Sequence, residues 1–198
     1  GGVITGLVVV GVVGTTAYWG YLSYKYGQHL PSIEITVNGS EREYNRFIPK
    51  NAPEGPLSLV VLLNGGGAEA WPFPQQRQWE ELGEEVGIAI AVPVGKRLPD
   101  NEGAWQLNTD ADSYQDIDYI NAIISDIGAS HPLDETKLYA VGYSLGSMFS
   151  YELACQMSDR FAAIASFAGT MPITTKSCNP KRNVPITHIH GLADPIIA

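Results

Sequence analysis

The sequence has 198 residues, of which 44% are hydrophobic and 17% charged, as in globular chains large enough to bury a sizeable core. A formal net charge of −9 argues against nucleic acids and anionic membrane surfaces as partners, because binding them requires a basic face. Two cysteines are too few for a small disulfide-framework fold or a four-ligand zinc site.

The N-terminal segment is apolar and carries no charge before Lys25. It is long enough to cross a bilayer, which takes about 20 residues, and the aromatic cluster from Tyr18 to Tyr24 resembles an interfacial belt. A buried globular helix is the alternative, but this run is rich in glycine and β-branched residues, which are poor helix formers in water. We therefore expect residues 1–26 to be a membrane anchor or signal segment, and the protein to be secreted, extracytoplasmic or membrane-anchored.

Residues 32–198 have the pattern of one α/β domain. Apolar and polar residues alternate over Ile33–Val37 and Glu41–Ile48, and Asn38-Gly39 between them predicts a β-hairpin. Buried strands are predicted at 57–63, 88–92, 138–141, 162–166 and 186–189, helices at 79–86, 114–127 and 147–157, and a long polar loop at 94–113. This alternation predicts a mostly parallel sheet flanked by helices, with the hairpin at its N-terminal edge.

The five residues Gly142-Tyr143-Ser144-Leu145-Gly146 lie between a predicted strand and a predicted helix. A serine on a tight strand-to-helix turn holds its hydroxyl clear of the sheet, and the strained backbone there requires small neighbours. The following helix points its N-terminal N–H groups at any oxyanion that forms beside the serine. Chance alone produces the motif in about one chain in ten of this size, so its setting, rather than the motif alone, favours a nucleophile over a glycine-rich connector.

A glycine run, Asn64-Gly65-Gly66-Gly67, follows the first long buried strand. Enzymes of this architecture take one oxyanion donor from the residue after the nucleophile, here the Leu145 N–H, and the other from this loop. We expect Gly66 or Gly67 to supply the second donor. The alternative is a plain strand-ending turn, for which a single glycine would be enough.

Asp194 follows the last predicted strand and comes after the serine, in the chain order of a Ser…Asp…His triad. We expect it to orient an imidazole and to stabilise its protonated form. His188 and His190 precede the acid and are interpreted as structural. His131 lies at the wrong end of the predicted sheet and His29 in a linker, so no histidine occupies the position expected of the base.

Residues from about 32 to 198 resemble the polyhydroxybutyrate-depolymerase-type esterases of the α/β-hydrolase superfamily, a group that includes secreted feruloyl and acetylxylan esterases. The resemblance is carried by GYSLGSMFSYELACQMSDRFAAIASFAGTMP, VPITHIHGLADPII and the DIDYI segment before the nucleophile strand. It implies an α/β-hydrolase fold, Ser144 as nucleophile, Asp194 as triad acid and a base histidine some tens of residues beyond Ala198. Because the chain starts without methionine and stops in an apolar run, we expect a C-terminally truncated fragment. Asn64 departs from the family, where a His-Gly pair is usual.

The two cysteines, Cys155 in a predicted helix and Cys178 in the loop before the last strand, are expected to form a disulfide if the protein is exported. Such a bridge would stabilise the fold by roughly 3 kcal/mol. The alternative is a pair of free thiols.

The sequence thus predicts a serine carboxylic-ester hydrolase that works through an acyl-enzyme on Ser144. The substrates implied by the resemblance are feruloyl or acetyl groups on polysaccharide, or hydroxyalkanoate polyesters. No metal or organic cofactor is expected, because no group of His, Cys and Asp has ligand spacing. Trp71, Phe73, Trp105 and Tyr143 are candidates either for a substrate pocket or for ordinary loop anchors. The alternatives are a serine peptidase of the same fold and a non-catalytic, membrane-anchored binding protein.

Overall fold

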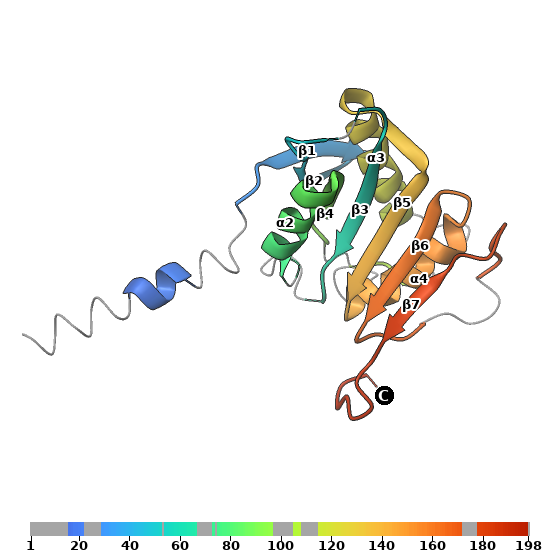
Figure 1. Cartoon of the computed structure of the whole chain (residues 1–198). Helices are drawn as coiled ribbons and strands as arrows, with labels where there is room; N and C mark the ends of the chain where they lie inside the picture. Colours follow the sequence, from blue (N-terminus) through green and yellow to red (C-terminus); the bar gives the residue numbers. More distant parts are fainter. Residues whose placement is uncertain are drawn as a thin grey trace, which may run out of the picture.

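The computed structural model describes residues 16–21, 29–52, 54–66, 73, 75–96, 105–107, 115–171 and 178–197. Within these residues, seven strands form one sheet in the order β1-β2-β4-β3-β5-β6-β7 (Figure 1). The strands are β1 (Ser32–Val37), β2 (Ser40–Phe47), β3 (Leu57–Leu63), β4 (Ile88–Pro93), β5 (Leu133–Tyr143), β6 (Phe161–Phe167) and β7 (Ile186–Ile189). The helices are α2 (Gln76–Val86), α3 (Gln115–Ser130) and α4 (Leu145–Gln156).

The hairpin at one edge of the sheet is confirmed. Asn38 and Gly39 both have positive φ, at 52° and 77°, which is the backbone that the tightest hairpin turns require. The strands β1 and β2 pair antiparallel from Val37 and Ser40 outward. β2 pairs antiparallel with β4, and every other neighbouring pair is parallel, so the predicted mostly parallel α/β sheet is present.

The core lies in two layers, one on each face of the sheet. Strand β3 shows why, because its side chains alternate between the faces. Leu59, Val61 and Leu63 belong to the cluster that contains the buried side chains of α3 and α4. Val60 and Leu62 belong to the second cluster, against which a side chain of α2 packs. Figure 1 shows the resulting arrangement, with α2 on one face and α3 and α4 on the other.

The order in which successive strands are added to the sheet reverses between β3 and β5. These strands are parallel neighbours, with Leu63 opposite Gly142 where they end. The chain leaves β3 toward α2 and leaves β5 toward α4, so the two connections depart to opposite faces. In open α/β sheets such a point leaves a crevice at the carboxyl ends of the strands, where ligands bind. The predicted nucleophile and the glycine run both follow directly from these two strands.

Helix and strand boundaries differ from the predictions where tertiary pairing decides them. β5 begins at Leu133, five residues earlier than predicted, because Leu133 pairs with Leu57 across an irregularity in the register. α2 begins at Gln76, directly after Gln75 in the left-handed region with φ 59°. α4 begins at Leu145, two residues before the predicted start, so the helix opens immediately after the serine.

The predicted membrane anchor or signal segment lies mostly outside the described residues. Of residues 1–26, the structure describes a short helical stretch at 16–21. No helix in the described part of the chain combines the length and the apolar character needed to cross a bilayer.

Candidate active site

Ser144 sits on the turn between β5 and α4 with an unusual backbone. Its φ of 53° and ψ of −120° lie in a region that costs a non-glycine residue about 1–3 kcal/mol. The turn is fixed at both ends, because the Ser144 N–H donates to the Phe167 carbonyl at 2.9 Å and the Met148 N–H donates to the Ser144 carbonyl at 3.1 Å. Backbone held in such a conformation is concentrated at functional sites.

The two glycines of the motif allow the turn to pack against neighbouring backbone. A Cβ placed on Gly146 would lie 2.1 Å from the Leu63 carbonyl oxygen and 2.4 Å from that of Asn64. A Cβ placed on Gly142 would lie 2.2 Å from the Gly146 carbonyl oxygen. The start of α4 therefore touches the end of β3 directly, and larger residues at these positions would separate them.

The glycine run after β3 lies against this turn. A Cβ on Gly65 would be 3.3 Å from the Ser144 Cβ, and one on Gly66 would be 3.8 Å from the Leu145 Cδ2. Gly66 and Leu145, both predicted as oxyanion donors, are thus neighbours. Gly67 lies outside the described residues. Sequence reasoning missed Gly65, whose contact with the serine depends on the register of β3 against β5.

Trp105, a predicted pocket residue or loop anchor, is buried against α4 and the end of β3. Its side chain is fully buried, and its ring stacks on Phe149 of α4 with centroids 5.0 Å apart. Its indole N–H donates to the Asn64 carbonyl at 2.8 Å. Trp105 therefore anchors its loop to α4 and to the end of β3, and its role in a substrate pocket stays a prediction. Trp71 lies outside the described residues.

A cavity of about 400 Å³ opens beside the turn, on the face of the sheet that carries α2. Tyr143, which is 43% exposed, lines it together with Phe167 and Ile189 from the next two strands. Phe73 and Trp79 form the other wall, with their rings edge to face at 6.5 Å. The lining is largely apolar and aromatic, which suits an uncharged acyl or aryl group.

Asp194 follows the carboxyl end of β7, at the end of the sheet where Ser144 follows β5. In Figure 1 the arrowheads of β3, β5, β6 and β7 all point to this end of the sheet. Two strand spacings of about 4.8 Å separate β7 from β5. The Ile197 and Ile196 N–H groups donate to the Asp194 carboxylate at 3.0 and 2.9 Å and lower its pKa below the usual range. His190 lies nearby, with Nε2 3.5 Å from the carboxylate and 2.8 Å from the Ile197 carbonyl.

Each of the other histidines contacts a side chain other than that of Ser144. His188 in β7 contacts the Tyr151 hydroxyl of α4 through Nδ1, at 2.7 Å. His131 stands between α3 and β5, at the opposite edge of the sheet from the turn. His29 contacts the Glu80 carboxylate at 2.6 Å. Within the described residues, no group of three or more His, Cys, Asp and Glu side chains is placed to hold a metal ion.

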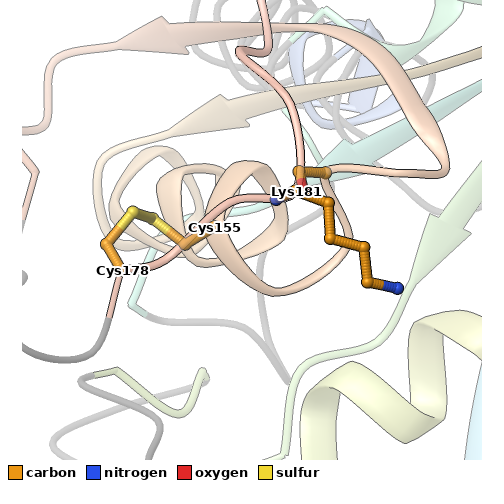
Figure 2. Close-up of a disulfide and its surroundings, with 4 residues drawn as sticks. Cys155, Cys178 and Lys181 are labelled. Carbon is orange, nitrogen blue, oxygen red and sulfur yellow. A yellow bond between two sulfur atoms is a disulfide. The ribbon is translucent and has the colours of Figure 1, made fainter.

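The expected disulfide between Cys155 and Cys178 is present, with the two Cα atoms 4.9 Å apart (Figure 2). It joins the last turns of α4 to the segment that leads into β7. The Lys181 N–H donates to the Ser158 hydroxyl at 2.8 Å, so the same segment is also held just beyond the helix. The bridge therefore connects the element that starts at the candidate nucleophile with the one that precedes the candidate acid.

Comparison with known proteins finds similar esterases. Residues 104–198 match the phospholipase/carboxylesterase family. The chain is 30% identical over 168 residues to feruloyl esterase C of Emericella nidulans, covering 81% of this chain and 57% of that protein. It is 29% identical over 162 residues to the bifunctional acetylxylan esterase/xylanase XynS20E of Neocallimastix patriciarum, covering 80% and 22%.

Solved structures show the same fold. A thermostable esterase superposes with a TM-score of 0.66 at 19% identity, covering 85% of this chain and 48% of its own. The chain spans less than three fifths of the length of each of these three proteins. Residues 104–198 are thus similar to the phospholipase/carboxylesterase family of α/β hydrolases, and feruloyl and acetylxylan esterases are distant homologues of the chain.

Proposed function

We propose that the protein is a serine carboxylesterase with Ser144 as its nucleophile. The observation that carries the proposal is the contact between two backbones at the switch point of the sheet. Ser144 is held at φ 53°, and the Gly65–Gly66 segment packs against it. A strained serine beside a glycine loop and a helix N-terminus is the arrangement that acyl transfer requires.

In this proposal the Ser144 hydroxyl attacks the ester carbonyl carbon and the alcohol leaves, which forms an acyl-enzyme that water hydrolyses. The Leu145 N–H at the start of α4 and an N–H of Gly66 or Gly67 stabilise the oxyanion. Asp194 is ionised at neutral pH, because backbone N–H groups lower its pKa, and it orients the imidazole that takes the serine proton. None of the four histidines of the sequence is assigned that role.

The proposed substrates are acyl groups ester-linked to polysaccharide, with hydroxyalkanoate polyesters as the second class. Relatives named as feruloyl and acetylxylan esterases support the first class. The apolar cavity beside Ser144, with Tyr143 and Phe167 on its wall, supports an aromatic acyl group. The Cys155–Cys178 bridge supports work in an oxidising compartment, reached through residues 1–26 as signal or anchor.

The test uses the protein expressed from its complete reading frame. Ser144→Ala should lower the hydrolysis of p-nitrophenyl acetate at least about a thousandfold, and a fluorophosphonate should label the Ser144 peptide in the wild type. The matched control is Ser125→Ala, which changes an exposed serine on α3 whose hydroxyl donates to the Asn121 carbonyl of its own helix. Retained activity in Ser144→Ala, or labelling of another residue, would refute the assignment. Rates on methyl ferulate, acetylated xylan and hydroxybutyrate oligomers then rank the substrate classes.

A further inference from the structure

The Asn64 carbonyl accepts a hydrogen bond from a buried donor, and the proposed chemistry does not use this bond. The donor is the Trp105 indole N–H, 2.8 Å away, on a side chain without exposed surface. A peptide unit is planar, so this bond also fixes the direction of the Gly65 N–H, which belongs to the same plane. Gly65 is the residue in contact with Ser144. The indole therefore determines the orientation of the peptide that begins the glycine loop.

Trp105 is itself held by a buried ion pair. The next residue, Gln106, donates its N–H to the Asp116 carboxylate at 2.6 Å. The other carboxylate oxygen lies 2.9 Å from the Arg42 guanidinium, and both side chains are almost fully buried. The guanidinium in turn lies over the Tyr119 ring, 3.8 Å from its centroid. Burial raises the pKa of the Asp116 carboxyl, and Arg42 opposes that rise.

These contacts join three elements that sequence alone does not bring together. Arg42 comes from β2, Asp116 from α3 and Trp105 from the loop between β4 and α3. The ring of Trp105 also stacks on Phe149, in the second turn of the helix that begins after the serine. One side chain thus touches both halves of the candidate site, the glycine loop through its N–H and α4 through its ring.

We propose that Trp105 is a positioning residue for the oxyanion loop, and that the buried Arg42–Asp116 pair holds it there. The proposal rests on the proposed function. Without the indole N–H, the peptide between Asn64 and Gly65 loses the bond that favours one orientation. A fraction of the molecules then carries a loop whose N–H groups do not converge on the oxyanion. Because donor preorganisation acts on the transition state, kcat falls while KM stays the same.

Trp105→Phe tests this directly, because it keeps a ring against Phe149 and removes the donor. After active-site titration with a fluorophosphonate, kcat should fall about ten- to a hundredfold with little change in KM. The inhibition constant of a phenylboronic acid, which forms a tetrahedral adduct on the serine, should rise by the same factor. Asp116→Asn, a second variant, keeps an oxygen for the Gln106 N–H and loses the charge, and should shift both quantities in the same direction by less.

The matched control is Tyr44→Phe, which removes another fully buried aromatic donor, one that bonds Asp126 of α3. It should lower stability and leave kcat unchanged. If Tyr44→Phe and Trp105→Phe lost kcat equally, general destabilisation would explain the loss in Trp105→Phe, and the positioning role would be overturned. An unchanged kcat in Trp105→Phe would overturn it as well. A wild type without Ser144-dependent turnover would instead refute the proposed function, and this inference with it.

Discussion

Gly146 offers the most direct test of how tightly the two halves of the site are packed. In Gly146→Ala the new Cβ would lie 2.1 Å from the Leu63 carbonyl oxygen and 2.4 Å from that of Asn64. Real Cβ atoms essentially never come closer than 3.0 Å to such atoms. Both obstacles are backbone at the end of a central strand, so no side-chain rotation relieves the contact, and the start of α4 must retreat by about 1 Å.

Two effects of that retreat can be estimated. Overpacking of this kind costs about 1–3 kcal/mol of stability, which lowers the Tm of a domain of this size by about 2–12 °C. The retreat also moves Leu145 away from the Gly65–Gly66 segment. A displacement of about 1 Å in a catalytic geometry costs about a hundredfold in rate. We therefore expect Gly146→Ala to lose far more activity than its loss of stability at assay temperature explains.

The assay measures ester hydrolysis at 25 °C, per active site, beside thermal unfolding of the same preparation. Gly128→Ala is the matched control, because Gly128 lies in α3 and its Cβ would meet only the Leu133 Cδ1, at 3.9 Å. Alanine in a helix is favoured over glycine by about 0.8–1.0 kcal/mol, so this variant should be as active as the wild type and slightly more stable. If Gly146→Ala kept full kcat with unchanged Tm, the direct contact between α4 and the end of β3 would be refuted.

Two further predictions concern the C-terminal half of the sheet. Cys178→Ala removes a disulfide with a sequence separation of 23 residues and should lower the free energy of unfolding by about 3 kcal/mol. Urea titration without reductant measures this loss. Equal urea midpoints for the variant and the wild type would contradict the prediction. His190→Gln keeps an N–H donor for the Ile197 carbonyl and should change kcat less than about tenfold, whereas a loss of a thousandfold or more would identify His190 as the catalytic base.

The sequence was informative wherever local chemistry decides structure. The hairpin followed from Asn38-Gly39, whose residues both adopt positive φ, and β3 and β7 have the predicted bounds. The beginning of β5 was not predictable, because residues 134–137 (DETK) are all polar and show no strand pattern. The segment becomes a strand because Leu133 pairs with Leu57. That pairing joins residues distant in sequence, so no local pattern reports it.

The candidate site also has features that the sequence predicts and features that it does not. The strained turn at Ser144 could be predicted, because such a turn needs glycine on either side, which leaves a signature in the sequence. The burial of Trp105 could not be predicted, because an aromatic residue in a polar loop suits a pocket wall and a buried anchor equally well. One signal was available in Asp116, a carboxylate on the apolar stripe of a helix with Ile117, Ile120 and Ile123. A charge in that position requires a buried partner, and the structure supplies Arg42.

Asn64, where the family that the sequence resembles is expected to have a His-Gly pair, contributes main-chain groups that a histidine would also have. Its main-chain carbonyl accepts from Trp105 and lies where a side chain on Gly146 would collide with it, while its side-chain amide donates to the Gly65 carbonyl at 3.4 Å. A histidine at this position would have the same main-chain groups. What the geometry does require is the small residue that follows, because a Cβ on Gly65 already comes within 3.3 Å of the Ser144 Cβ. The fit of the loop against the serine therefore depends on the glycines and, in our proposal, on the indole that orients the peptide between Asn64 and Gly65.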